Sequence, residues 1–464
     1  MWRAFCVLAG LAGPVPLASL GKFGFLRGAL AMVQIYPVLI CDSADAGMWP
    51  MARAACPDIF APIFQGRSAF QNAAQALRGP QMARPLVVVA MAHRFLALGQ
   101  LAALGIAPAD ILALPSLPDR TMALGLAALH LQARAGAEVG LLALPLAGAL
   151  PQLDGVAQAV PRAVPDILQG KIGQFCTGKQ DDTGLWFGTA GRIVQLLQRH
   201  AGTEMGVWGA ALAAARRDLA FTCLDECMAV ADAAPLAQAL GDLPNWPVPG
   251  AQGGVHASWQ GLRRHLGEDA QAVAMSGPVT ALGCRDCLLV AGDPGQPLVA
   301  LGLENILAVA LPDGVLVAPL GPDGAGGASA GPMGRLPLAV PLPVQAQPPR
   351  RTDRPWGWFE TLAQGPRFAV RRVVLHPGAQ MGLHSHQFCA EHWVVVAGTA
   401  QLRLDYTTQL LPEGQAAYAP AGTVHQLANP GKLPLTLIEL RTGAHLEQDD
   451  ILRYDIAPPP LPGP

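Results

Sequence analysis

The chain has 464 residues, a length that favours about three domains and gives ample material for buried cores. Hydrophobic residues make up 51% and charged residues 14%, yet no stretch of about 20 residues is free of charges and of Pro or Gly breaks, as a membrane-spanning helix requires. The net charge of −2 argues against nucleic-acid and anionic-lipid partners, and nine cysteines, an odd number, favour a reducing, cytoplasmic location.

Residues 1–31 are expected to precede the folded chain. An early Arg3 and the apolar run after it resemble a signal peptide, which is the alternative interpretation. Pro14 and Pro16 interrupt that run, however, and a strand pattern begins soon after Met32. We therefore expect a mis-assigned start or a disordered tail.

Residues 32–265 show short apolar runs that alternate with helical patterns. This alternation indicates a parallel, doubly wound α/β sheet that is covered by helices on both faces. The runs predict strands over 36–41, 85–91, 111–114 and 139–144, and helices over 69–77, 95–104 and 122–135.

Four further segments follow this domain. Residues 266–320 change to short strands separated by Gly, Pro and Asp turns, which predicts a small all-β unit similar to a β-helix. Residues 321–353 are rich in Gly and Ala and then in Pro, so we expect a linker. Residues 354–456 alternate in short strands and predict a β-barrel or jelly roll, and residues 457–464 form a Pro-rich tail.

The strongest chemical signal lies in the predicted barrel, where one run reads G-x5-H-x-H-x4-E-x6-G and a second reads G-x5-P-x-G-x2-H-x3-N. Alternate residues of a strand point to the same side, so His384 and His386 should face one way. We expect Glu391, beyond a bend, and His425, on a partner strand, to join them. Three imidazoles and one carboxylate suit a divalent metal, zinc first, with Fe, Mn, Ni or Co as other candidates.

These two runs resemble the two motifs of the cupin family. Four flanking stretches resemble the isomerase half of type II mannose-6-phosphate isomerases: RPWG at 354–357, AEHWVVV at 390–396, PAGTVH at 420–425 and DDILR at 449–453. In that family a cupin commonly follows a mannose-1-phosphate guanylyltransferase domain of nucleotidyltransferase-like fold. The resemblance implies a sugar-phosphate substrate and catalytic roles for Glu391, His392 and Arg453, with Arg453 holding the phosphate.

The predicted barrel departs from the family pattern at two places. Where the family has Gln-x-His-His-His-Arg-Ala-Glu-His-Trp, this chain has His384 for the Gln and Cys389 for the Arg. The Tyr-Gly-Arg ending of the family is replaced by Ile456 and a Pro-rich tail. Metal binding is retained but two cations are lost, so we expect weak isomerase activity, poor substrate affinity and partial recovery of affinity in Cys389→Arg.

The predicted α/β domain over residues 32–265, the front domain, keeps part of the family's sequence pattern but lacks its catalytic groups. Where the family reads Gly-Gly-Ser-Gly-Thr-Arg-Leu-Trp-Pro, this chain reads DSADAGMWP. Asp42 and Asp45 thus replace glycines of the phosphate cradle, and Asp58 replaces a lysine. Ala147 and Val255 stand where the family has metal-binding aspartates. Reversing one charge at about 4 Å changes the interaction by several kcal/mol, so we expect guanylyltransferase activity to be lost.

The whole sequence therefore predicts an isomerase that interconverts mannose 6-phosphate and fructose 6-phosphate for GDP-mannose and polysaccharide biosynthesis. Aldose–ketose exchange removes a proton next to a carbonyl and stabilises an enediolate, which a base and a divalent metal can do. Two alternatives stay open: a non-catalytic protein that binds a sugar phosphate or an active paralogue, and a bifunctional enzyme that keeps guanylyltransferase activity. Formation of a homo-oligomer also stays open.

Overall fold

The structure is a computed structural model that forms two compact units, each described here by itself. Unit 1 lies within residues 1–44, 61–91 and 104–267, and unit 2 within 45–60, 92–103 and 268–464. The residues that the structure describes are 34–42, 48–53, 55–63, 66–80, 82–117, 119–146, 149–150, 153–176, 185–218, 220–225, 240, 243–247, 255–256, 259–320, 351–446 and 448–454.

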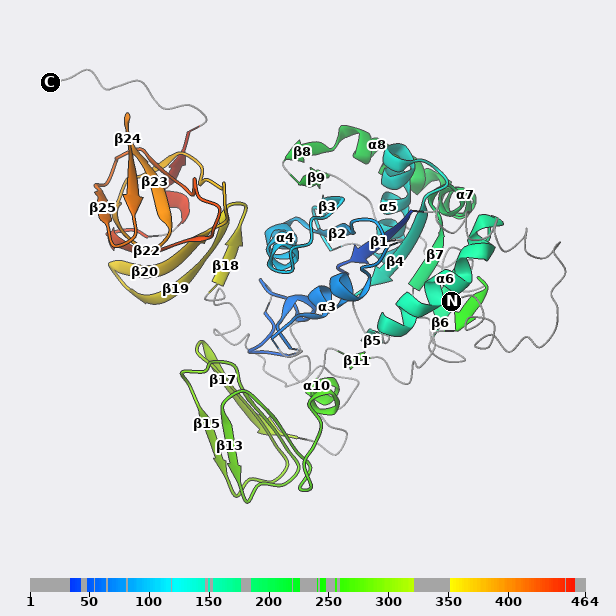
Figure 1. Cartoon of the computed structure of the whole chain (residues 1–464), viewed down its shortest axis with the longest axis horizontal. Coiled ribbons are helices and arrows are strands. Elements are labelled where there is room, and N and C mark those ends of the chain that lie inside the picture. Colours follow the sequence, from blue (N-terminus) through cyan, green and yellow to red (C-terminus); the bar gives the residue numbers. More distant parts are fainter. Residues whose placement is uncertain are drawn as a thin grey trace, which may run out of the picture. The chain divides into compact units, whose positions relative to one another are not determined.

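Unit 1 is built on one mixed sheet of nine strands (Figure 1). In spatial order they are β10 (Asn245–Pro247), β6 (Gly173–Cys176), β7 (Leu185–Thr189), β4 (Gly140–Pro145), β1 (Ile35–Ile40), β2 (Leu86–Ala90), β3 (Asp110–Leu114), β9 (Phe221–Cys223) and β8 (Arg216–Asp218). The parallel core β4-β1-β2-β3-β9 agrees with the prediction. The prediction of a wholly parallel sheet is wrong, because β7 runs antiparallel to β4 and β6 and β8 runs antiparallel to β9.

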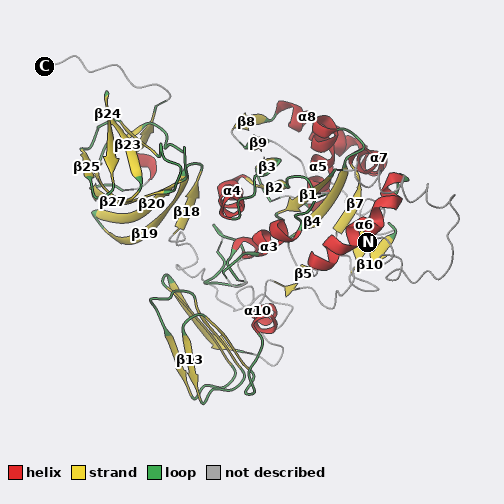
Figure 2. Ribbon diagram, in the orientation of Figure 1, coloured by secondary structure: helices red, strands yellow, loops and turns green. Residues whose placement is uncertain are grey.

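Helices cover this sheet on both faces (Figure 2). On one face α5 (Arg120–Ala135), α7 (Ala190–His200) and α8 (Gly202–Ala214) contact one another and bury a core of Val, Leu, Ile and Ala side chains against the strands. α3 (Ala69–Ala76) and α6 (Leu153–Leu168) contact each other and other parts of the sheet. Two short elements pair beside it, β5 (Ala149–Leu150) and β11 (Val255–His256), followed by α10 (Trp259–Leu266).

No helix among the described residues is long and apolar enough to cross a membrane. The helices predicted over 69–77 and 122–135 correspond to α3 and α5, which begin at side-chain caps from Ser68 and Asp119. The helix predicted over 95–104 is α4 (Arg94–Ala103), which belongs to unit 2 together with the short 3-10 turn η1 (Asp58–Phe60).

The all-β segment of unit 2 is a short parallel solenoid, as predicted. One sheet stacks β12 (Val273–Ser276), β14 (Cys287–Ala291) and β16 (Ile306–Leu311) in parallel, with β17 (Gly314–Pro319) antiparallel at its edge. A second sheet pairs β13 (Val279–Leu282) with β15 (Leu298–Leu301). Asp286 and Asn305 occupy equivalent corners and both have positive φ, a conformation that short polar side chains tolerate.

The C-terminal domain consists of two antiparallel sheets around one apolar core, the cupin architecture predicted from the sequence. The first sheet contains β18 (Arg351–Arg354), β19 (Gly357–Gly365), β20 (Phe368–Leu375), β27 (Leu435–Gly443), β22 (Cys389–Ala397) and β25 (Ala416–Ala419). The second contains β24 (Thr407–Pro412), β23 (Thr399–Leu404), β26 (His425–Ala428), β21 (His384–His386) and β28 (Ile451–Arg453).

One predicted boundary needs correction. The sequence places residues 351–353 in the linker because their side chains are polar, but they open the edge strand β18, which pairs with β19. Arg351 lies over the ring of Trp358 at 4.4 Å and forms an ion pair with Asp353. Charged side chains on an edge strand are common, and this strand therefore reads like a linker in the sequence.

Candidate metal centre

The structure brings the four predicted metal ligands of the cupin domain together. His384 and His386 lie on β21, Glu391 on β22 and His425 on β26. His384 pairs directly opposite His425 between β21 and β26. One ligand atom from each of the four residues lies within 4.8 Å of every other. These distances fit a single divalent ion.

The alternation of β22 places Glu391 inside the domain. Cys389, Glu391 and Trp393 are buried, whereas the residues between them, Ala390 and His392, are more exposed. His392 therefore points outward, and its ring lies 4.3 Å from that of Tyr418. The predicted catalytic role of His392 is wrong for this reason: neighbouring residues of a strand face opposite sides, so His392 cannot share a pocket with Glu391.

Two of the imidazoles are held with one nitrogen turned toward the cluster. His384 Nδ1 lies 2.8 Å from the carbonyl oxygen of Gly382, and His425 Nδ1 lies 3.0 Å from that of Thr423. A carbonyl only accepts, so both Nδ1 atoms carry hydrogen and both Nε2 atoms face the cluster. His425 Nε2 is buried without a hydrogen-bond partner, 3.1 Å from Glu391 Oε2. Both atoms carry lone pairs, so a metal ion or a proton is needed between them. The donor set of this cluster therefore fits a metal ion.

The electrostatics of the cluster favour a ligand carboxylate at Glu391. Burial would raise its pKa, but the contacts with His386 and His425 outweigh burial and hold the pKa of Glu391 well below its usual range. Burial and the neighbouring His425 lower the pKa of His384 to about 4, so this imidazole is neutral at pH 7. An ionised carboxylate beside a neutral imidazole is the state that metal binding requires.

The motif spacing missed three buried charged residues beside the cluster. Arg441 on β27 lies opposite Glu391 in the sheet, with its Nε 3.2 Å from Glu391 Oε1. Asp450, just before β28, lies 3.4 Å from His386 Nδ1 through its Oδ2. Glu439, also on β27, accepts from Trp393 Nε1 at 3.4 Å. Burial and the nearby Glu391 raise the pKa of Glu439, in contrast to that of Glu391.

Arg453, the predicted phosphate-binding residue, lies at the cluster. It pairs opposite His384 between β28 and β21, so the two side chains share one face. Arg354, which the sequence assigned no role, lies close to it: burial and the neighbouring Arg453 and Arg371 lower the pKa of Arg354. Arg354 and Arg371 both lie over the ring of Phe359, at 5.5 and 4.6 Å. The cupin thus carries a group of cations beside its metal ligands.

At the predicted nucleotide cradle of unit 1, Asp42 is not a free anion. Its Oδ2 lies 2.6 Å from Arg120 Nε, its Oδ1 accepts from the backbone N–H of Leu146 at 3.0 Å, and its side chain is 4% exposed. Asp42 is therefore engaged with protein groups, although the sequence placed it in the phosphate cradle, where it would face a nucleotide. This carboxylate ties the end of β1 to the end of β4 and to the start of α5.

The other residues predicted for the cradle are placed separately. Asp58 is buried in unit 2 and accepts from the backbone N–H of Ile59. Val255 lies in β11 of unit 1, opposite Leu150. Asp45 and Ala147 lie outside the described residues.

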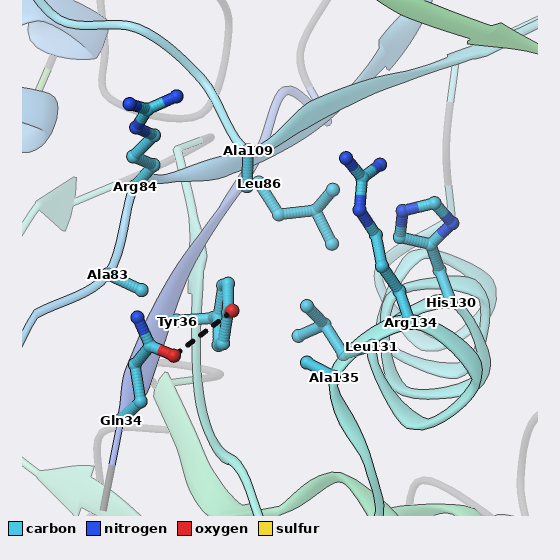
Figure 3. A pocket seen from close by; sticks show the side chains of 10 residues that line it. All are labelled: Gln34, Tyr36, Ala83, Arg84, Leu86, Ala109, His130, Leu131, Arg134 and Ala135. Atoms are coloured by element: carbon cyan, nitrogen blue, oxygen red, sulfur yellow. Dashed lines mark hydrogen bonds between the residues drawn. The ribbon is translucent and has the colours of Figure 1, made fainter.

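Unit 1 also contains a cavity of about 310 Å³ that the sequence did not predict (Figure 3). It lies at the amino-terminal ends of β1, β2 and β3, and Arg84, His130 and Arg134 are among its lining residues. Arg134 forms an ion pair with the buried Asp110, which neutralises part of its charge, and His130 Nε2 lies 3.2 Å from the same carboxylate oxygen. Ligands of open α/β sheets bind beyond the carboxyl ends of the strands, so this cavity lies at the opposite edge from the predicted cradle.

The strand order and the ligand cluster define the class of protein: an α/β domain followed by a β-solenoid and a cupin that carries a cluster of possible metal ligands. Residues 345–456 match the family model described as mannose-6-phosphate isomerase C-terminal. The chain is 28% identical to the xanthan biosynthesis protein XanB of Xanthomonas campestris pv. campestris, covering 91% of this chain and 99% of the relative. The chain is thus similar over nearly its whole length to proteins of the mannose-1-phosphate guanylyltransferase and mannose-6-phosphate isomerase family, the resemblance that its sequence motifs indicated.

Two further similarities extend over much of the chain. A mannose-1-phosphate guanylyltransferase of Escherichia coli is 26% identical and covers 92% of this chain and 98% of its own length. A solved structure described as mannose-1-phosphate geranyltransferase from Thermus thermophilus is 16% identical, with a TM-score of 0.46, and covers 62% of this chain and 95% of that chain.

Proposed function

We propose that this chain interconverts mannose 6-phosphate and fructose 6-phosphate at a divalent metal, zinc first, bound by the cupin domain. The observation that carries the proposal is the convergence of His384, His386, Glu391 and His425, with two Nε2 atoms turned toward one point. The family description and the xanthan-biosynthesis name of one relative support a role in GDP-mannose and polysaccharide biosynthesis.

The two buried glutamates, Glu391 and Glu439, have different roles in the proposed reaction. A bound metal would polarise the adjacent oxygens of the open-chain sugar. Glu391 stays ionised because its pKa is low, which suits a ligand better than a base. Glu439 has a raised pKa and lies on the inner face of β27, so we assign to it the proton transfer at the carbon next to the carbonyl. The opposite pKa shifts of two neighbouring carboxylates support this assignment.

The cations beside the cluster would hold the substrate phosphate. Arg453 shares its face with His384, and Arg354 lies close to Arg453. Arg372, in contrast, is exposed and paired with Glu360. We therefore propose Arg453 as the principal phosphate ligand and Arg354 as its partner.

The isomerase assay on the zinc-loaded full chain tests this proposal. We expect Arg453→Ala to raise KM by roughly 10- to 150-fold, because a charge-assisted contact contributes about 1.5–3 kcal/mol. Glu439→Gln should instead lower kcat by about 10²- to 10⁴-fold while zinc still binds. Arg403→Ala, whose side chain bonds the backbone of its own hairpin, serves as the control and should leave both constants unchanged. A wild type without turnover at saturating substrate would favour the non-catalytic alternative.

We also propose that the guanylyltransferase activity of the family has been lost in this chain. Asp42 at the end of β1 is engaged by Arg120 and Leu146, where the family pattern has a glycine that leaves room for phosphate. Calorimetry with GTP and Mg²⁺ should give no heat of binding, and GDP-mannose should not form. Micromolar GTP binding or GDP-mannose formation would contradict the proposal and establish the bifunctional alternative.

A cytoplasmic location completes the proposal. The seven cysteines among the described residues are all unpaired, which supports a reducing compartment.

A further inference from the structure

His386 differs from the other two imidazoles of the cluster in what surrounds its second nitrogen. His384 Nδ1 and His425 Nδ1 each face one carbonyl oxygen, which fixes the hydrogen on Nδ1. His386 Nδ1 faces two charged groups of opposite sign, the carboxylate of Asp450 at 3.4 Å and the guanidinium of Arg441 at 3.2 Å. These two neighbours favour hydrogen on different nitrogen atoms of the imidazole ring.

Asp450 favours the form of His386 that can bind a metal. Its Oδ1 accepts from the backbone N–H groups of Gln387 and Phe388, at 2.9 and 3.0 Å, and these bonds fix the carboxylate. Its Oδ2 is buried without a hydrogen-bond partner and is directed at His386 Nδ1. A carboxylate can only accept here, so it stabilises hydrogen on Nδ1 and leaves the Nε2 lone pair for the metal.

Arg441 favours the other form. A guanidinium is always a donor, so its Nη2 can bond His386 Nδ1 only when Nδ1 carries no hydrogen. The hydrogen then lies on Nε2, which is 2.9 Å from Glu391 Oε1 and has no lone pair left for a metal. Arg441 Nε also lies 3.2 Å from the same Glu391 oxygen, so the guanidinium balances this carboxylate when no metal does.

Arg441 has other acceptors within reach. Its Nη2 lies 3.2 Å from Cys389 Sγ and its Nη1 donates to the carbonyl oxygen of Leu446 at 3.0 Å. Burial raises the pKa of Cys389 to about 11, so the thiol stays neutral and offers only a weak bond. The guanidinium can thus give up its contact with His386 without being left unpaired.

We propose that Asp450 and Arg441 are opposed positioning residues that select which nitrogen of His386 carries its hydrogen, Asp450 strengthening metal binding and Arg441 weakening it. The hydrogen leaves Nε2 for water and another returns from water to Nδ1, so no net proton is gained or lost. This inference rests on the metal site of the proposed function but not on its substrate or its turnover.

Two substitutions of the full chain separate these opposed effects through the zinc dissociation constant, measured by competition with a chromophoric chelator. Asp450→Asn keeps the oxygen that bonds the 387–388 backbone but turns an amide donor toward His386 Nδ1, so zinc should bind about 10- to 100-fold more weakly. Arg441→Gln removes the guanidinium that favours hydrogen on His386 Nε2, together with its positive charge beside Glu391, so zinc should bind at least about threefold more tightly. Asp449→Asn and Arg372→Gln make the same chemical changes at exposed side chains and should leave the constant unchanged.

The direction in which each variant changes the zinc affinity decides whether the inference holds. Weaker zinc binding in both variants would mean that the two residues merely support the fold, and would overturn the inference. Nitrogen NMR of the ¹⁵N-histidine-labelled wild type gives a second readout that needs no variant. On adding zinc, the hydrogen of His386 should move from Nε2 to Nδ1 while His384 keeps its own on Nδ1, and an unchanged His386 would contradict the proposal. A wild type that binds no zinc would instead refute the proposed function.

Discussion

Replacing His386 and His425 together by alanine should remove zinc binding from the full chain. Outer-shell partners of a metal typically change its affinity by 10- to 100-fold, so the loss of two direct ligands should exceed about a thousandfold. At 100 times its dissociation constant, zinc should raise the free energy of unfolding of the wild type by about 2.7 kcal/mol, and it should leave the double variant unchanged. Metal content after dialysis and thermal unfolding with and without zinc measure both effects.

His445→Ala is the matched control for this experiment. His445 is half exposed, pairs with Asp449 on the surface and contributes no atom to the ligand cluster. Its removal should leave one zinc per chain. A double variant that still binds one zinc would show that the ion lies elsewhere and would remove the basis of the proposed isomerase.

Introducing arginine at position 389 should destabilise the cupin instead of improving substrate binding. Cys389 is 2% exposed, and Arg441 Nη2 already lies 3.2 Å from its sulfur. A second guanidinium at this point would be buried beside the first, and only the Asp450 carboxylate, already held by the 387–388 backbone, lies next to it; we expect a cost of about 3–5 kcal/mol. The geometry thus reverses the expectation drawn from the family pattern, and chemical denaturation of Cys389→Arg measures the loss.

A double variant tests whether charge is the cause. Cys389→Arg combined with Arg441→Gln carries a single guanidinium, so it should regain most of the lost free energy of unfolding. Cys389→Ser, which keeps size and an acceptor, should change stability by less than about 1 kcal/mol. A Cys389→Arg variant as stable as the wild type and with a lower KM would contradict this prediction. The new arginine would then bind the substrate phosphate, and its burial beside Arg441 would not be destabilising.

The fold was largely predictable because strand and helix periods are strong in this chain. The strands predicted over 85–91 and 111–114 correspond to β2 and β3 to within one residue at each end. The direction of β7 was not predictable, because a strand buried on both faces gives the same apolar run whether its neighbours are parallel or antiparallel. Apolar content records burial but carries no information on chain direction.

The metal ligands were predictable because both motifs have fixed spacings, whereas their charged neighbours lie outside those spacings. Glu439 and Arg441 belong to no motif, but they follow Leu435 and Leu437 at every second position of β27. The alternation of inward and outward side chains along this strand could therefore have placed Glu439 and Arg441 on the inner face. A charged residue is rarely found there without a function. Asp450 gave no such signal, because its contact with His386 depends on how β28 returns to β21.

The contacts of Asp42 have a consequence for the stability of the front domain. This carboxylate, at a position where the family pattern has glycine, joins three chain segments through Arg120 and Leu146. Restoring glycine at position 42 would first remove this link and leave the guanidinium of Arg120 without the carboxylate, before any nucleotide could be gained in exchange. The acidic side chain is thus a structural part of this domain, and replacing it alone by glycine should lower the free energy of unfolding without restoring nucleotide binding.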